Sequence, residues 1–298
     1  MMTIDQNQKI LNTDIKISLM KKSILTLLII SFISSSLMAQ VPSFSKSMNA
    51  VGNAAQPFLF SVNTFTSETP FVSVSASGNY AERTAGPFGY DGVDQQLAVK
   101  GYLGNRFTLL ANADLGFSRT GSTASAQQAE VIRDFVGGKS FYGARFGVGL
   151  GANRDFSSVG AVFSRVTAAF ESPTWRIGGN FKFEKAFAKD RDGIDLISSI
   201  GYQHRIAGAF FAGIEAVGED LEGFWETDEA EGGAKLLLGP SLNYAPMYSR
   251  FSFSLSGGPV FYATHSTVLG SEAIRDIGTA GTQNGYSIRA MVAFNIGR

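Results

Sequence analysis

The stretch that decides the fold is residues 106–118, which read RFTLLANADLGFS. Its odd positions carry Phe107, Leu109, Ala111, Ala113, Leu115 and Phe117, and its even positions include Thr108, Asn112, Asp114, Gly116 and Ser118. A period of two predicts a β-strand with two unlike faces. A soluble sandwich would bury the apolar face, whereas a membrane barrel turns that face to lipid and keeps the polar face in its lumen.

The same alternation recurs along the chain from residue 58 onward. The candidate strands are twelve: 58–66, 71–82, 95–103, 106–118, 141–153, 157–169, 174–187, 194–204, 208–218, 234–245, 250–262 and 285–297. Most of them are long enough to cross a bilayer when tilted and exceed the usual length of soluble strands. Only closed barrels and helices satisfy every backbone group in lipid. We therefore predict an all-β, transmembrane, antiparallel up-and-down β-barrel of about 12 strands over residues 58–298.

Loop lengths test this prediction, because such barrels alternate short periplasmic turns with longer outer loops. The connections in the C-terminal half alternate between short and long as expected. If the same alternation is continued into the N-terminal half, the long stretches 83–94 and 119–140 fall on the periplasmic side. One solution is a hidden strand within 124–136 together with loss of the strand at 58–66. The other is that residues 126–136 form a short helix, at the periplasmic side or inserted in the lumen.

The N-terminus carries the features of an export signal. A basic start at 20–22 precedes an apolar run at 24–33 and small residues before Gln40, which together predict a signal peptide at 20–39 that is cleaved after Ala39. Residues 1–19 are expected to be an extension upstream of the signal, and residues 40–57 a short periplasmic segment. The predicted location is the cell outer membrane.

Composition excludes several classes of function. The chain has no cysteine, which removes disulfides, thiol chemistry and Cys-based metal sites. Its 25 basic residues balance 25 acidic ones without a basic stripe, so nucleic acid is not an expected partner. The expected partners are outer-membrane lipid, the outer-membrane assembly machinery and a small solute.

Charged residues on the predicted polar faces are the candidate lumen lining: Asp114, Arg145, Arg176, Lys182, Glu184, Asp195, Glu215 and Arg289. A second feature is an acidic outer loop at 219–231 that contains Glu219, Asp220, Glu222, Glu226, Asp228, Glu229 and Glu231 and no basic residue. At a barrel mouth this loop would favour cations and repel anions. It could equally bind divalent ions, or be a solvated loop without a selected partner.

No catalytic, cofactor or metal site is predicted. His204 lies at an expected tight turn, and His265 with Ser266 opens an expected outer loop, where a lipase would need further partners. The stretch 190–195 lacks the spacing of a calcium loop and is interpreted as a turn.

The segments 220–226 and 229–235, followed by Leu238-Gly239-Pro240, carry a family resemblance. They resemble the acidic loop and following strand of outer-membrane barrels related to the phenol-degradation-pathway (MetA-like) predicted transporters. The end of the signal peptide, Leu37-Met38-Ala39-Gln40, resembles those of Bacteroidota. This resemblance implies a transporter-like barrel. The chain departs from many outer-membrane proteins because it ends in Arg298 instead of an aromatic residue.

Three functions follow as hypotheses. The first is a passive pore or transporter for small solutes, with a polar lumen and an acidic outer loop. The second is a non-conducting structural or surface-interaction barrel whose loops at 119–140, 219–233 and 263–284 contact lipids or proteins. The third, an outer-membrane hydrolase, depends on His265.

Overall fold

The computed structural model describes residues 56–62, 71–119, 121–137, 142–188, 194–225, 234–246, 249–263 and 284–296. All of these residues belong to the compact unit that spans Ser45–Arg298. Among them, no helix is long and apolar enough to cross a membrane.

The described residues form twelve β-strands and two short 3-10 helices. The strands are β1 (Val72–Glu82), β2 (Gly92–Gly104), β3 (Phe107–Ser118), β4 (Thr123–Val136), β5 (Gly143–Arg154), β6 (Gly160–Glu171), β7 (Trp175–Ala186), β8 (Asp195–Ala207), β9 (Phe210–Glu219), β10 (Lys235–Tyr244), β11 (Phe251–Tyr262) and β12 (Gly285–Asn295). The 3-10 helices are η2 (Gly86–Phe88) and η3 (Leu221–Phe224).

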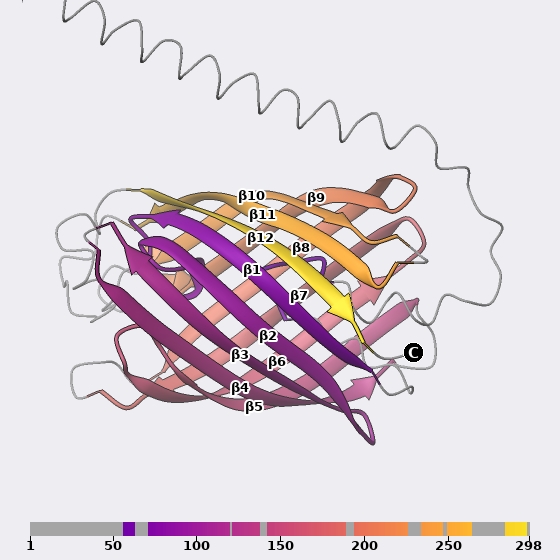
Figure 1. The fold of residues 1–298 in the computed structure, drawn as a ribbon, viewed down its shortest axis with the longest axis horizontal. Coiled ribbons are helices and arrows are strands. Elements are labelled where there is room, and N and C mark those ends of the chain that lie inside the picture. The colour runs from indigo at the N-terminus through magenta and orange to yellow at the C-terminus, as the bar shows by residue number, and fades with distance from the viewer. Residues whose placement is uncertain are drawn as a thin grey trace, which may run out of the picture. The chain divides into compact units, whose positions relative to one another are not determined.

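Each strand pairs with its neighbours in the sequence, and the sheet closes on itself. β1 pairs antiparallel with β2 on one side and with β12 on the other, where Val74 lies opposite Phe294. The result is a closed up-and-down barrel with no free edge (Figure 1). The predicted all-β barrel of twelve antiparallel strands is confirmed.

In the N-terminal half, the structure contains the hidden strand, which restores the expected alternation of short and long connections. Residues 123–136 form β4, which pairs with β3 and β5, so the alternative reading of 126–136 as a helix is wrong. The expected strand at 58–66 is also wrong for residues 58–62, which lie outside the sheet, and residues 63–66 lie outside the described residues. The stretch 119–140 is therefore no loop, because most of it is β4.

The connections at one end of the barrel are short, and those at the other end are on average longer. The C-terminal end carries the connections 105–106, 137–142, 172–174, 208–209 and 245–250, and the opposite end carries 83–91, 119–122, 155–159, 187–194, 220–234 and 263–284. The longest connections lie at the opposite end. In outer-membrane barrels, short turns face the periplasm, so the C-terminal end is the periplasmic end by this rule.

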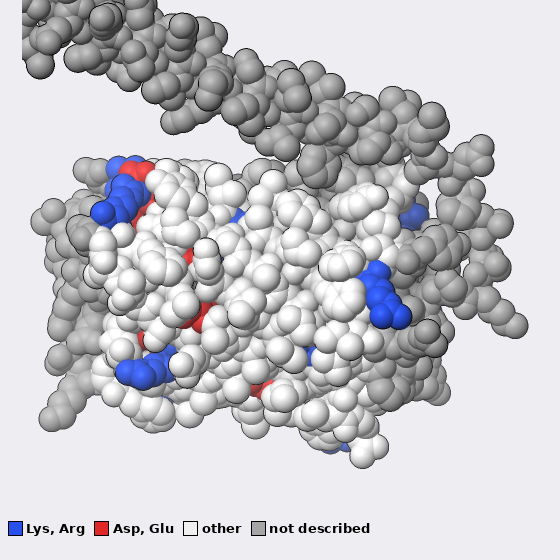
Figure 2. All heavy atoms as spheres, in the orientation of Figure 1, with Lys and Arg blue, Asp and Glu red and all other residues white. Residues whose placement is uncertain are grey.

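The outer face of the barrel is apolar. Large hydrophobic side chains such as Leu97, Leu150 and Ile214 are each more than half exposed. In the view of Figure 2, the wall between the two ends is almost free of charged side chains, which gather near the ends. Such a continuous apolar exterior would aggregate in water, but it fits the hydrocarbon region of a bilayer.

The inner face is polar, and its polar groups are buried by the barrel itself. Ser254, Ser287, Gln203 and Glu215 have no solvent exposure. Polar residues buried in this way need hydrogen-bond partners. Those partners come from other strands and from a segment inside the barrel.

Candidate functional site

The lumen contains an internal segment formed by residues Gln56–Val62, which precede the first strand. Its peptide groups bind inward-facing side chains of several strands instead of a neighbouring strand. The Nε2 of Gln203 on β8 donates to the carbonyl oxygen of Pro57 at 2.9 Å. The Oγ of Ser254 on β11 donates to the carbonyl oxygen of Gln56 at 2.6 Å. Ser254 lies near the periplasmic end of β11, so this part of the segment lies toward that end.

Glu215, in the middle of β9, is the main anchor of the internal segment. Its carboxylate accepts hydrogen bonds from the backbone N–H of Leu59 at 3.1 Å and of Phe60 at 2.8 Å. The Oγ of Ser256 donates to the same carboxylate at 2.8 Å. Because three donors converge on this buried carboxyl group, it fixes the backbone of the segment.

Further contacts hold both sides of the segment. The Nδ2 of Asn180 on β7 donates to the carbonyl oxygen of Val62 at 2.9 Å, and Asn180 also accepts from the N–H of Val62. The guanidinium of Arg289 on β12 donates to the carbonyl oxygen of Leu59 at 3.2 Å and stacks on the Phe60 ring. The segment is therefore bound to the wall formed by β7–β12.

The connection between β1 and β2 fills the same half of the lumen from the opposite end. Phe88 of η2 is fully buried and packs with Val217, Leu237, Val260 and Tyr262 from β9–β11. Phe60 of the internal segment packs against this cluster as well. Apolar side chains inside the barrel thus join η2 to the internal segment and fill the lumen beside β9–β11.

The other half of the lumen remains hollow. A cavity of about 760 Å³ is lined mainly by residues of β1–β7 and by the internal segment, including Phe60 and Leu59. Residues of β8, β9 and β12 complete its lining: Ile197, Glu219, Arg289, Met291 and Ala293. Its outer mouth carries Tyr90 and Phe156, whose ring centroids are 4.9 Å apart. Its lining includes carboxylates, amides, hydroxyls and basic side chains, as expected for a path through which polar solutes pass.

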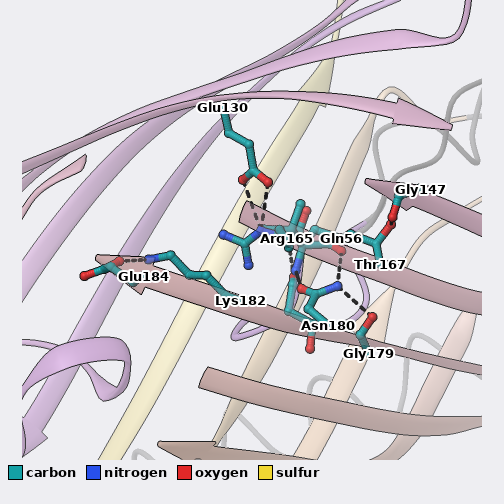
Figure 3. A network of polar contacts seen from close by, with 11 residues as sticks. Gln56, Glu130, Gly147, Arg165, Thr167, Gly179, Asn180, Lys182 and Glu184 are labelled. Atoms are coloured by element: carbon teal, nitrogen blue, oxygen red, sulfur yellow. Dashed lines mark hydrogen bonds and ion pairs between the residues drawn. The ribbon is translucent and has the colours of Figure 1, made fainter. Parts of the chain in front are cut away.

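Two ion pairs lie on the β4–β7 wall beside this cavity (Figure 3). The Nε of Arg165 donates to both oxygens of Glu130, at 2.9 and 3.1 Å. Lys182 binds Glu184, which also accepts a hydrogen bond of 2.7 Å from Asn153. The Phe163 ring lies beneath both cations, with Arg165 and Lys182 at 5.5 and 4.4 Å from its centroid. Each cation is thus held beside a counterion.

The structure places the residues predicted to line the lumen as follows. Arg145, Arg176, Lys182, Glu184 and Glu215 are buried inside the barrel, Asp114 and Arg289 line the cavity, and Asp195 opens β8 opposite Glu184. Arg176 does not face the cavity: its guanidinium binds Gln203 and Asn243 and stacks on Phe211. Glu215 likewise belongs to the filled half.

The acidic loop is not uniformly solvated. Glu219 ends β9 and is buried, and it accepts a hydrogen bond of 2.7 Å from Lys235 of β10. Asp220 precedes η3, which contains Glu222. Burial, followed by the nearby charge of Glu219, raises the pKa of Asp220 to about 7. Glu226, Asp228, Glu229 and Glu231 lie outside the described residues.

The remaining predicted features bear little on the lumen. His204 lies within β8 opposite Ala212 and is exposed, so it is not a turn residue as expected. His265 and most of the stretch 190–195 lie outside the described residues. Among the residues that the structure describes, no group of three or more His, Asp or Glu side chains could hold a metal ion.

Sequence reasoning missed several lumen charges, of which Asp94 matters most here. The expected strand began at residue 95, whereas β2 begins at Gly92. Asp94 is buried and lines the cavity. The signal was present, because Asp94, Gln96, Ala98 and Lys100 continue one face with a period of two.

Fold, apolar exterior and polar lumen together define an outer-membrane β-barrel with a porin-like channel architecture. No protein-family model and no curated protein sequence matches the chain.

Solved structures of similar fold include the KdgM porin in complex with disordered oligogalacturonate, at 12% identity over 74% of this chain and 98% of that one, with a TM-score of 0.46. The NanC porin is 10% identical over 74% and 98% of the two chains, with a TM-score of 0.48. The COG4313 outer membrane channel from Pseudomonas putida F1 is 8% identical over 81% and 100%, with a TM-score of 0.46. Likeness at this level does not extend to a transported solute.

Proposed function

We propose that this protein is a passive outer-membrane pore for small polar solutes, with an off-axis path through the cavity beside the internal segment. The observation that carries the proposal is the cavity of about 760 Å³ beside the filled half of the barrel. A barrel that served only as a scaffold would not need a hollow half lined with charges, because buried charges are costly unless they are paired or hydrated.

The lining favours solutes that are polar and small. Serine hydroxyls of β1 (Ser73, Ser75 and Ser77) lie beside the amides of Gln96, Asn112 and Gln128. The Oδ1 of Asn112 is buried and accepts no hydrogen bond from any residue that the structure describes, so a donor from solute or water would satisfy it.

A non-conducting barrel is the second candidate, and the internal segment favours it. Residues 56–62 and Phe88 fill one half of the lumen, and a wall-bound segment stabilises a barrel whether or not solutes pass.

Liposome swelling distinguishes these two functions. Residues 40–298 would be refolded into liposomes, and insertion checked by the heat-dependent migration of folded barrels on gels. Swelling in small sugars or amino acids, declining as the solute grows, is the result expected of a pore. Sealed liposomes that contain folded protein would overturn the pore and leave the structural barrel.

A further inference from the structure

The charged side chains in the hollow half of the lumen fall into two groups: some lie beside a group of opposite charge, and others contact only neutral donors. On the β4–β7 wall, the Arg165 guanidinium binds Glu130, and the Lys182 ammonium binds Glu184. At the outer mouth, Arg119 lies 3.1 Å from Glu82 and 3.8 Å from Asp91. These cations have carboxylates beside them, so their charge contributes little to the net field along the path.

Asp94 and Asp114 on the opposite wall have a different environment. The Asp94 carboxylate accepts hydrogen bonds from the Nδ2 of Asn79 at 2.8 Å and from the N–H of Tyr90 at 2.9 Å. The Asp114 carboxylate accepts from the Nε2 of Gln96 at 2.7 Å. All three donors are neutral. They fix the two carboxylates in place without cancelling their negative charge.

The two carboxylates act on the same space. Gln96 faces Asp114 in the register of β2 with β3, and Asp94 lies one inward-facing position away. All three line the cavity. Arg289 is the basic group that attracts Asp114, but its guanidinium is also attracted to Glu215 and is held on the internal segment. Arg289 is thus shared between Asp114 and Glu215. Lys100 of β2 also lines the cavity, but it lies further along the strand toward the periplasmic end, where Asp134 attracts it. Beside Asp94 and Asp114, the β2–β3 side of the path therefore carries a local negative charge.

We propose that Asp94 and Asp114 make this pore selective for cations, so that small cationic solutes pass ahead of anions of the same size. The inference rests on the proposed pore function and adds its charge specificity. A fixed negative charge in a narrow, partly desolvated path attracts cations more strongly than the same charge on an outer loop, where water and salt screen it. The selecting residues are therefore in the lumen and not in the acidic loop.

The reversal potential in a potassium chloride gradient across a planar bilayer tests this proposal. The natural sequence should prefer K⁺ over Cl⁻ several-fold. Asp94→Asn with Asp114→Asn should abolish that preference, while discrete conductance steps persist. Asp114→Asn alone should remove part of the preference, and this variant still tests the proposal if the double variant does not fold.

The matched control neutralises four acids of the loop, with Glu226→Gln, Asp228→Asn, Glu229→Gln and Glu231→Gln. This control should keep most of the preference for K⁺. Unchanged selectivity after substitution of both lumen aspartates would overturn the inference, as would loss of selectivity in the loop variant alone. A folded, inserted protein without any conductance steps would instead refute the proposed pore itself.

Discussion

The Oε1 atom of Glu215 lies 2.8 Å from the backbone nitrogen of Phe60, which joins the middle of β9 to a segment that precedes β1. This hydrogen bond spans 155 positions of the sequence. The segment that this bond holds separates the filled half of the lumen from the hollow half. In the proposed pore, solutes pass on the hollow side of the segment.

Replacing Glu215 should loosen the internal segment. Glu215→Gln keeps the size of the side chain but turns one acceptor oxygen into a donor, so one of the two N–H groups it holds is left unsatisfied. We expect a loss of about 1–3 kcal/mol in the free energy of unfolding, together with noisier and larger single-channel currents. Urea unfolding in detergent and bilayer recordings measure the two effects.

Glu171→Gln is the matched control, because Glu171 is a buried lumen carboxylate near Arg176 and Arg145. It should leave the current noise unchanged. Equal noise in both variants would contradict the anchoring role of Glu215.

Gly201 on β8 provides a steric test of the same segment. A Cβ atom at this position would lie 2.2 Å from Cδ1 of Phe58, so Gly201→Ala requires the Phe58 ring to move. Overpacking of this kind costs about 1–3 kcal/mol, which should lower the urea midpoint. Gly101→Ala on β2 is the control, since nothing lies within 4 Å of its added Cβ. A midpoint that falls equally in both variants would show that strand propensity, and not the packing of Phe58, is responsible.

The buried pair of Glu219 and Lys235 should be sensitive to loss of one partner. Their charged atoms are 2.7 Å apart, and both side chains are almost fully buried. Lys235→Met leaves a buried carboxylate without its counterion, and breaking such a pair costs about 3–5 kcal/mol. Lys235→Met combined with Glu219→Gln should recover most of that loss in urea unfolding. A single variant as stable as the natural sequence would contradict the ion pair.

Because of Asp220, we expect the free energy of unfolding to depend on pH. Burial, with the neighbouring Glu219 charge, raises its pKa from 3.8 to about 7, so the folded state binds a proton that the unfolded state has released. Its contribution to stability is fully present below pH 3.8 and is lost as the pH rises through about 7. Asp220→Asn should remove this part of the pH dependence and match the natural sequence at the acidic limit. Identical slopes between pH 4 and 7 would refute the prediction.

The strand pattern was predictable because lipid outside and water or polar partners inside impose a period of two on every strand of the wall. β3 and β12 show it plainly. β4 was obscured by its alanine, glutamine and glutamate residues, which have high helix propensity. Pairing with β3 and β5 overrides that propensity, since an unpaired strand in the wall would leave backbone groups unsatisfied in lipid.

The internal segment could not be predicted in the same way. Phe58, Phe60 and Val62 alternate with other residues as a strand would, and a period of two does not distinguish a wall strand from an extended segment bound inside. Phe88 gave no signal either, since it lies in a connection. Glu215 was expected to face the lumen, but its partners at Leu59 and Phe60 follow only from the three-dimensional structure.

The central claim is that solutes pass through the cavity beside the internal segment, and not through the part of the lumen that this segment and Phe88 fill. The absence of cysteine makes a direct measurement clean, because single cysteines can be placed on either wall. Ala126→Cys lies on the cavity and Ser241→Cys lies behind the internal segment. The decisive measurement is single-channel conductance before and after a negatively charged, water-soluble thiol reagent is added. We predict that the current falls for Ala126→Cys and stays constant for Ser241→Cys, whereas block at Ser241→Cys with none at Ala126→Cys would contradict the off-axis path.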